Sequence, residues 1–107
     1  MILSNTETIA GYSIVEVKGV VTGNMVQSKH LLKDIISGLK SLIGGEIKEY
    51  TDMLDGARVQ AQNRMMDEAH KLGANAVVNV RFTTSSIMRS MSEILAYGTA
   101  VIIKKDQ

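Results

Sequence analysis

The amino-acid sequence predicts an α+β two-layer sandwich, in which an antiparallel sheet carries two helices on one face. Three observations lead to this fold class. β-Branched residues cluster near both ends of the chain, apolar residues recur at steps of three and four in its middle, and glycines separate these stretches. The resulting order is strand, helix, helix, strand, strand, and one sheet covered by both helices buries their apolar faces most simply.

Composition limits the function more by exclusion than by any positive signal. The chain has 107 residues, so we expect one domain spanning 1–107. Lys and Arg number 12 against 11 Asp and Glu, a balance that argues against a nucleic-acid module or a polybasic membrane anchor. Cysteine is absent, which excludes disulfides and thiolate metal ligands. The N-terminus has no signal-peptide pattern and no apolar run is long enough to span a membrane, so we expect a soluble cytoplasmic protein.

The first strand is expected within residues 2–26. Val15 and Val17 alternate with Glu16 and Lys18, which is typical of a strand with one face more exposed to solvent than the other. Glycines inside this stretch predict a bulge or a bend.

The middle of the chain predicts two helices. The first begins after Ser28 as its N-cap and ends at Gly44-Gly45, and its apolar stripe is wide for a helix of a small monomer. The second runs from about Thr51 to Leu72. Its alanines permit close approach to whatever the helix packs on. Its apolar positions, at steps of three and four, are Leu54, Ala57, Ala61, Met65, Ala69 and Leu72.

The C-terminal third predicts two strands. In the first, Ala76 to Phe82, Val78, Val80 and Phe82 should share one face, with Asn79 and Arg81 on the other. Residues 84–92 show no clear period and are expected to form a hairpin loop, and the last strand covers 92–104. Three main strands leave two sheet edges, which invite pairing with another chain. We therefore expect a homo-oligomer.

Several strings of the sequence resemble one family along essentially the whole chain. They are VVTG at 20–23, GLKSLIGGE at 38–46, LGANAVVNVRF at 72–82 and EILAYGTAV at 93–101. They are similar to the YbjQ-like family of small bacterial proteins, which also carries a heavy-metal-binding label. Two positions depart from the family pattern: Asn75 replaces the usual Asp, and residues 89–92 replace a stretch that is often rich in Gly and Ala.

The resemblance implies a subunit fold related to that of dodecin, assembled as a homopentameric ring. It implies that short strands tie neighbouring subunits together, here at Ile2–Ser4 and around Val20–Val26. It implies no settled activity, and a metal ion as cofactor follows from the family label alone. A flavin site like that of dodecin would use Trp, which this chain lacks.

The metal label finds little support in the residues themselves. Soft heavy metals prefer thiolate, which is absent. The weak candidates are His30 and His70, the latter with Asp67 one helical turn before it. A solvated helix surface accounts for these residues more simply, and the seven methionines are better explained as core residues than as thioether ligands.

No catalytic motif is visible, because no nucleophilic side chain has a base near it in the sequence pattern. We therefore expect a protein that is not an enzyme. Arg81 and Glu93 are the polar residues of most interest, since each lies in or beside an apolar strand. One interpretation is an ion pair across strands or subunits. The other is a ligand pocket between subunits, formed by Thr22, Asn24, Arg81, Glu93 and Tyr97.

These observations favour a homo-oligomeric protein that binds a small ligand or metal ion between subunits. The alternative is a structural ring that acts as a scaffold for another protein. The sequence names neither the ligand nor the partner.

Overall fold

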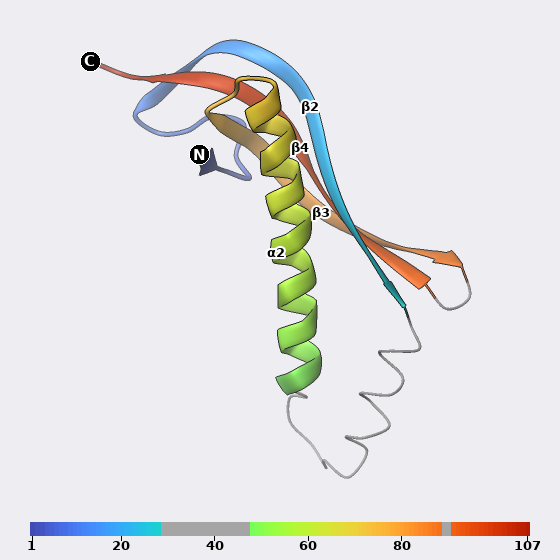
Figure 1. Ribbon diagram of the computed structural model, residues 1–107. Helices are drawn as coiled ribbons and strands as arrows, with labels where there is room; N and C mark the ends of the chain where they lie inside the picture. Colours follow the sequence, from blue (N-terminus) through green and yellow to red (C-terminus); the bar gives the residue numbers. More distant parts are fainter. Residues whose placement is uncertain (29–47, 89–90) are drawn as a thin grey trace.

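A computed structural model of the chain describes residues 1–28, 48–88 and 91–107. It has an α+β fold in which one long helix crosses one face of a twisted sheet (Figure 1). The elements are β1 (Ile2–Leu3), β2 (Tyr12–Ser28), α2 (Lys48–Lys71), β3 (Ala76–Met88) and β4 (Met91–Lys105). The predicted α+β class is therefore confirmed, while the first predicted helix lies outside the described residues.

Within the described ranges, the sheet has four strands in the order β1-β3-β4-β2. β4 pairs antiparallel with β2 on one side and with β3 on the other, as predicted for the main strands. β1 pairs parallel with β3, so the sheet is mixed rather than purely antiparallel. In this structure Ile2–Leu3 pairs within its own chain, where the resemblance implied a tie between subunits.

A bulge in β3 overturns the predicted alternation of its side chains. The register with β4 shifts between Val78 and Arg81, and Asn79 adopts a positive φ of 55°. Because one extra residue is inserted, Val77 and Val80 both pack in the cluster beneath α2, whereas Val78 belongs to a second cluster. The prediction that Val78 and Val80 share a face is wrong for this reason.

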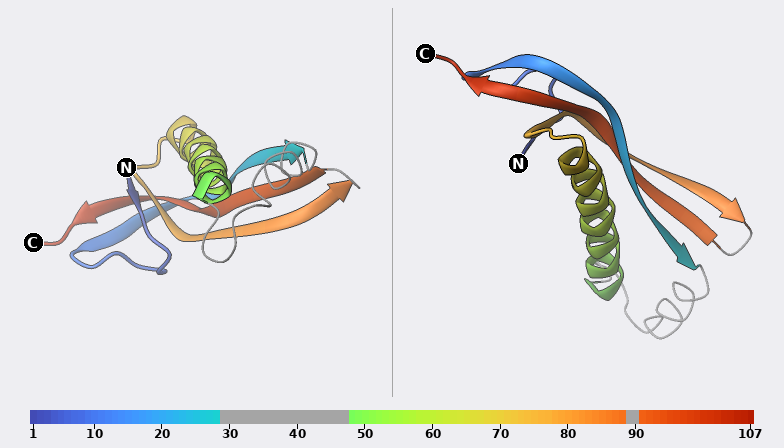
Figure 2. Two further views of the ribbon diagram at one scale, coloured as in Figure 1. Left: turned by 90° about the horizontal axis from the view of Figure 1, so that it is seen from below. Right: turned by 45° about the horizontal axis from the view of Figure 1, so that its top comes forward.

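The predicted hairpin loop is also wrong, because both strands continue through most of it. Thr84 pairs with Ile94 and Ser85 pairs with Glu93, and the ladder reaches Met88 and Met91. Threonine and isoleucine fit a pleated sheet even where the sequence shows no alternation. Figure 2 shows the two strands extending together as an arm beyond the helix.

Helix α2 packs on the sheet through small residues, as its alanine spacing predicted. Ala57, Ala61, Met65 and Ala69 are buried at intervals of four residues. A Cβ built on Gly23 of β2 would lie 2.2 Å from the Ala61 carbonyl oxygen and 2.3 Å from the Met65 backbone nitrogen. The strand and the helix backbone are therefore in direct contact, which only glycine allows.

The other face of the sheet is covered only near one end. A second cluster of buried residues packs against Ile9 and Tyr12 from the N-terminal segment; it consists of Ala76, Val78, Val101 and Ile103.

The chain is elongated. It measures 57 × 28 × 16 Å and its radius of gyration is 17.3 Å, against about 13 Å for a compact domain of this length. Among the helical residues described, none forms a helix long and apolar enough to cross a membrane.

Candidate functional site

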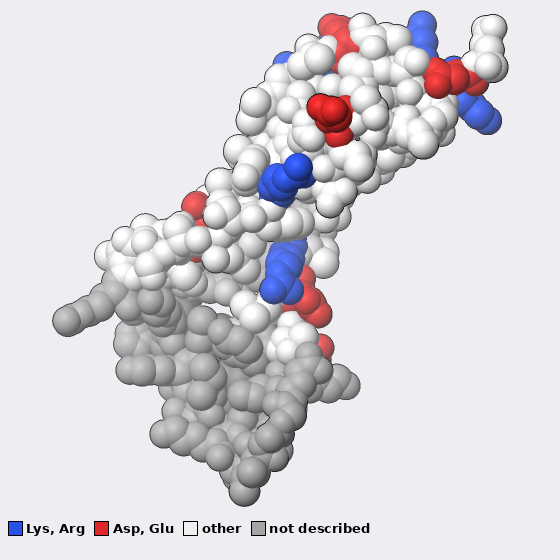
Figure 3. Space-filling view, turned by 180° about the vertical axis from the view of Figure 1, so that it is seen from behind, with Lys and Arg blue, Asp and Glu red and all other residues white. Residues whose placement is uncertain are grey.

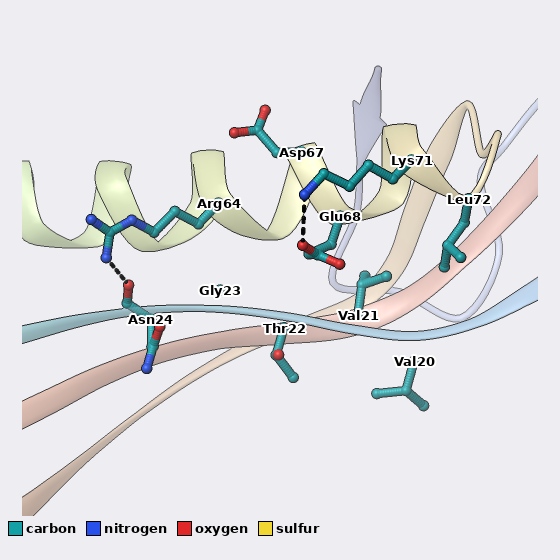
Figure 4. Close-up of a pocket in the computed structure, with 10 residues that line it drawn as sticks. All are labelled: Val20, Val21, Thr22, Gly23, Asn24, Arg64, Asp67, Glu68, Lys71 and Leu72. Atoms are coloured by element: carbon teal, nitrogen blue, oxygen red, sulfur yellow. Dashed lines mark hydrogen bonds and ion pairs between the residues drawn. The ribbon is translucent and has the colours of Figure 1, made fainter.

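The five predicted ligand residues lie on one face of the sheet, opposite α2, which we call the open face. Tyr97 on β4 is the cross-strand partner of Thr22 on β2 and of Arg81 on β3. Directly paired residues share a face, and the intervening residues Val21 and Ala96 are buried beneath α2. Figure 4 shows Thr22 and Asn24 on the side of β2 away from the helix.

A hydrogen bond joins two of these residues across strands. The Asn24 Nδ2 donates to the Glu93 Oε2 at 2.9 Å. Glu93 is half-buried and is paired in register with Val26 on one side and Ser85 on the other. A carboxylate that accepts an amide hydrogen bond is held in a fixed orientation. The open face thus presents one oriented negative charge at its surface.

Arg81 does not pair with Glu93 within the chain, so the predicted ion pair across strands is wrong, while an ion pair across subunits stays a prediction. Its partner in the β4 register is Tyr97, four positions from Glu93, which corresponds to about 13 Å along a strand. Instead, its Nη1 donates to the Asn5 carbonyl oxygen at 2.7 Å and to that of Val80 at 3.1 Å. Arg81 therefore holds the N-terminal segment beside the β3 bulge.

Replacing Arg81 with alanine should loosen this segment without unfolding the sheet. We expect a loss of about 1 kcal/mol in the free energy of unfolding. The Asn79 amide, which donates to the Thr6 carbonyl oxygen, should exchange with deuterium faster in the variant. The control is Lys71→Ala, which removes an exposed ion pair with Glu68 and should change stability by a few tenths of a kcal/mol. Unchanged exchange at Asn79 would show that Arg81 does not anchor the segment.

Apolar side chains surround the polar residues of the open face. Val20 is 75% exposed, and Val17, Val26 and Tyr97 are exposed as well. Figure 3, which views the molecule from the side opposite to Figure 1, shows a surface that is largely uncharged apart from scattered groups. Exposed apolar side chains that share one face of a sheet indicate an interaction site in soluble proteins.

A groove lies between the edge strand β2 and helix α2, and we call it the β2–α2 groove (Figure 4). It encloses about 640 Å³, and the Arg64 Nη1 donates across it to the Asn24 carbonyl oxygen at 2.6 Å. Its lining consists of Val20, Val21, Thr22, Gly23, Asn24, Arg64, Asp67, Glu68, Lys71 and Leu72. No motif in the sequence indicated this groove. The signal that could have pointed to it is Gly23, because a residue without a side chain lets the helix lie directly on the strand.

The weak metal candidates do not form a site on the described residues. His70 and Asp67 are exposed on α2, and the neighbouring carboxylate of Glu68 pairs with Lys71 at 3.3 Å. No group of three or more His, Asp or Glu side chains gathers within residues 1–28, 48–88 and 91–107. His30 lies outside the described residues. With no thiolate in the chain, the donor set described here does not suit a heavy metal.

Comparison with known proteins identifies the family. The YbjQ family model, described as putative heavy-metal-binding, matches residues 1–104. The chain belongs to this family. It is 62% identical over 105 residues to a UPF0145 protein of Thermosipho africanus, covering 98% of this chain and 97% of that one. The predicted resemblance is confirmed.

The family extends beyond bacteria, which corrects its description as bacterial. A UPF0145 protein of Archaeoglobus fulgidus is 57% identical over 104 residues, covering 97% of this chain and 96% of that one. The fold is similar to the crystal structure of a protein of unknown function of the DUF74 family from Pediococcus pentosaceus. The TM-score is 0.64 at 19% identity, with 97% of this chain and 98% of that chain covered. The similarity to the Pediococcus pentosaceus structure supports the fold alone.

Proposed function

We propose that this YbjQ-like chain is a homo-oligomeric binding protein that holds a small polar ligand between copies on the open face. The observation that carries the proposal is the Asn24–Glu93 hydrogen bond, which fixes a carboxylate among exposed apolar side chains. Such a site suits a ligand that offers a hydrogen-bond donor or a positive charge to Glu93. The ligand's apolar part would lie against Tyr97 and Val26.

Self-association is proposed because one chain leaves apolar surface that it does not cover. Fully burying a valine side chain contributes roughly 1.5–3 kcal/mol, and Val17, Val20 and Val26 are all exposed on β2. Most oligomers of identical chains close by symmetry, and the pentameric ring follows from the family resemblance. Neither the family description nor the relatives' names include an enzymatic activity, and a non-catalytic role fits them.

A charge placed on the open face should break the assembly. We expect Val17→Glu, at a position that is 64% exposed on the open face and lies outside the lining of the β2–α2 groove, to shift the protein to monomers in sedimentation velocity at micromolar concentration, because assembly would bury an unpaired carboxylate. The matched control is Val59→Glu, on the exposed side of α2, where valine is 54% exposed and the assembly should persist. Equal sedimentation of both variants and the parent protein would contradict an interface on the open face.

Ligand binding is tested by neutralising the oriented carboxylate. We expect Glu93→Gln to reduce the amount of small molecule that copurifies with the protein about 10-fold or more, because charge-assisted hydrogen bonds contribute roughly 1.5–3 kcal/mol. The readout is mass spectrometry of the fraction released on denaturation. Asp55→Asn, at an exposed carboxylate of α2 that pairs with Arg58, is the control and should retain the full amount. An assembled parent protein that releases no small molecule would favour the scaffold function instead.

A further inference from the structure

We infer that the β2–α2 groove receives the edge of β3 from a second copy of this chain, with Phe82 as the anchoring side chain. The inference rests on the homo-oligomer proposed above and names a contact that builds it. The contact is heterologous, since it joins two different surfaces of identical chains.

The sheet offers two edges that can meet. Among the described residues, β2 is the outer strand and has β4 as its only neighbour in the sheet. Within the part of the chain that the structure describes, β1 covers β3 only at Ala76 and Val77, so the segment Phe82–Ser85 has a neighbouring strand on one side alone. Backbone N–H and C=O groups at such edges are templates for pairing. When the β3 edge of one copy pairs with the β2 edge of the next, each added copy still offers one free β2 edge and one free β3 edge. The assembly closes into a ring when the rotation between neighbouring copies divides a full turn evenly.

Phe82 lies on the side of the sheet where such a contact would bury it. Its cross-strand partner is Ala96, which is fully buried beneath α2. Phe82 shares that face, yet it is 42% exposed within the chain. When β3 adds to the edge of β2, the residues on its helix side enter the groove beneath the other copy's α2. Leu72, which is 43% exposed, lines that groove and offers an apolar contact for the ring.

The charges of the groove favour an uncharged strand over an ionic ligand. Arg64 and Lys71 are balanced by Asp67 and Glu68. Lys71 pairs with Glu68 at 3.3 Å and Arg64 donates to the Asn24 carbonyl oxygen, so both cations already have acceptors. The segment Phe82–Ser85 reads Phe-Thr-Thr-Ser and carries no charge. It can enter without leaving a buried charge uncompensated, which an anion or a charged peptide would do.

Cysteine cross-linking tests the contact directly, because the chain contains no cysteine of its own. The double variant Phe82→Cys/Leu72→Cys is treated with oxidised glutathione and run on a denaturing gel without reductant. We expect a ladder of covalent multimers, because each copy would link its position 82 to position 72 of the next. The control Phe82→Cys/Val59→Cys places the second thiol on α2 but outside the groove and should stay monomeric on the gel.

The outcomes separate this contact from the proposed assembly. A Phe82→Cys/Leu72→Cys variant that is oligomeric in sedimentation under reducing conditions but gives no ladder on oxidation would overturn the contact and leave the assembly standing. A parent protein that is monomeric in sedimentation would overturn both. Phe82→Ser provides a test without cross-linking, since the side chain is partly exposed and its loss should not unfold the chain. It should raise the dissociation constant of the assembly at least 10-fold, whereas Val59→Ser should leave it unchanged; equal constants would also overturn the contact.

Discussion

Gly23→Ala is expected to lower the free energy of unfolding by about 3 kcal/mol or more, because its methyl group has no space. The new Cβ would lie 2.2 Å from the Ala61 carbonyl oxygen and 2.9 Å from the Arg64 carbonyl carbon. Both atoms belong to the backbone of α2, so the strain cannot be relieved by a side-chain rotation. The helix must move away from β2, which opens the core along its length. Urea unfolding followed by circular dichroism measures the loss.

Gly56→Ala is the matched control for this prediction. Gly56 lies inside α2, and a Cβ there meets nothing within 4 Å. The same chemical change should therefore stabilise the protein by about 1 kcal/mol, the difference in helix propensity between alanine and glycine. The two substitutions should change the free energy of unfolding in opposite directions. A destabilisation at Gly23 no larger than a few tenths of a kcal/mol would contradict the direct contact between helix and strand.

Met65→Ala is expected to cost about 3 kcal/mol, because it leaves a cavity at the centre of the core. Met65 is the largest residue of the buried stripe of α2 and is fully buried against the sheet. The helix cannot close the cavity by moving inward, since its backbone already touches Gly23.

Met88→Ala is the control, because Met88 is an exposed methionine near the end of the β3–β4 arm. Its replacement should change the unfolding free energy by less than about 0.5 kcal/mol. Thermal or urea unfolding of the pair, analysed against the parent protein, gives both values. Similar losses in the two variants would show that Met65 does not occupy the core as described.

The sequence predicted α2 well, because one physical signal determines it. The step of four between Ala57, Ala61, Met65 and Ala69 requires a buried helical stripe, and the predicted end at Leu72 lies one residue from the observed end at Lys71. The arm around residues 84–92 was not predictable from alternation. Residues 84–88 are exposed on both faces in one chain, so no pattern of burial marks their register.

The β3 bulge could not be predicted for a different reason. Asn79 takes a positive φ, which asparagine tolerates better than most residues, but a single asparagine within a valine run gives no separate signal. The bulge places Arg81 beside Asn5, a contact between residues 76 positions apart. This long-range contact is why Arg81 anchors the N-terminal segment instead of pairing with Glu93.

The placement of the candidate residues in the fold was predicted in part, and their role in ligand binding stays a prediction. Thr22, Asn24, Glu93 and Tyr97 do share the open face, because strand parity and the antiparallel register determine which residues lie together. The β2–α2 groove was missed, since it depends on how closely two segments approach and not on any local pattern. Its existence follows from Gly23 and the small residues of α2 once they are seen in contact.

Native mass spectrometry of the protein, purified without a metal-affinity tag, tests the central claim most directly. That claim is that copies of this chain assemble and enclose a small ligand beside Glu93. We expect one dominant oligomer, a pentamer by family resemblance, whose mass exceeds that of the bare chains by a stoichiometric small molecule. A monomer across the micromolar range would contradict the claim.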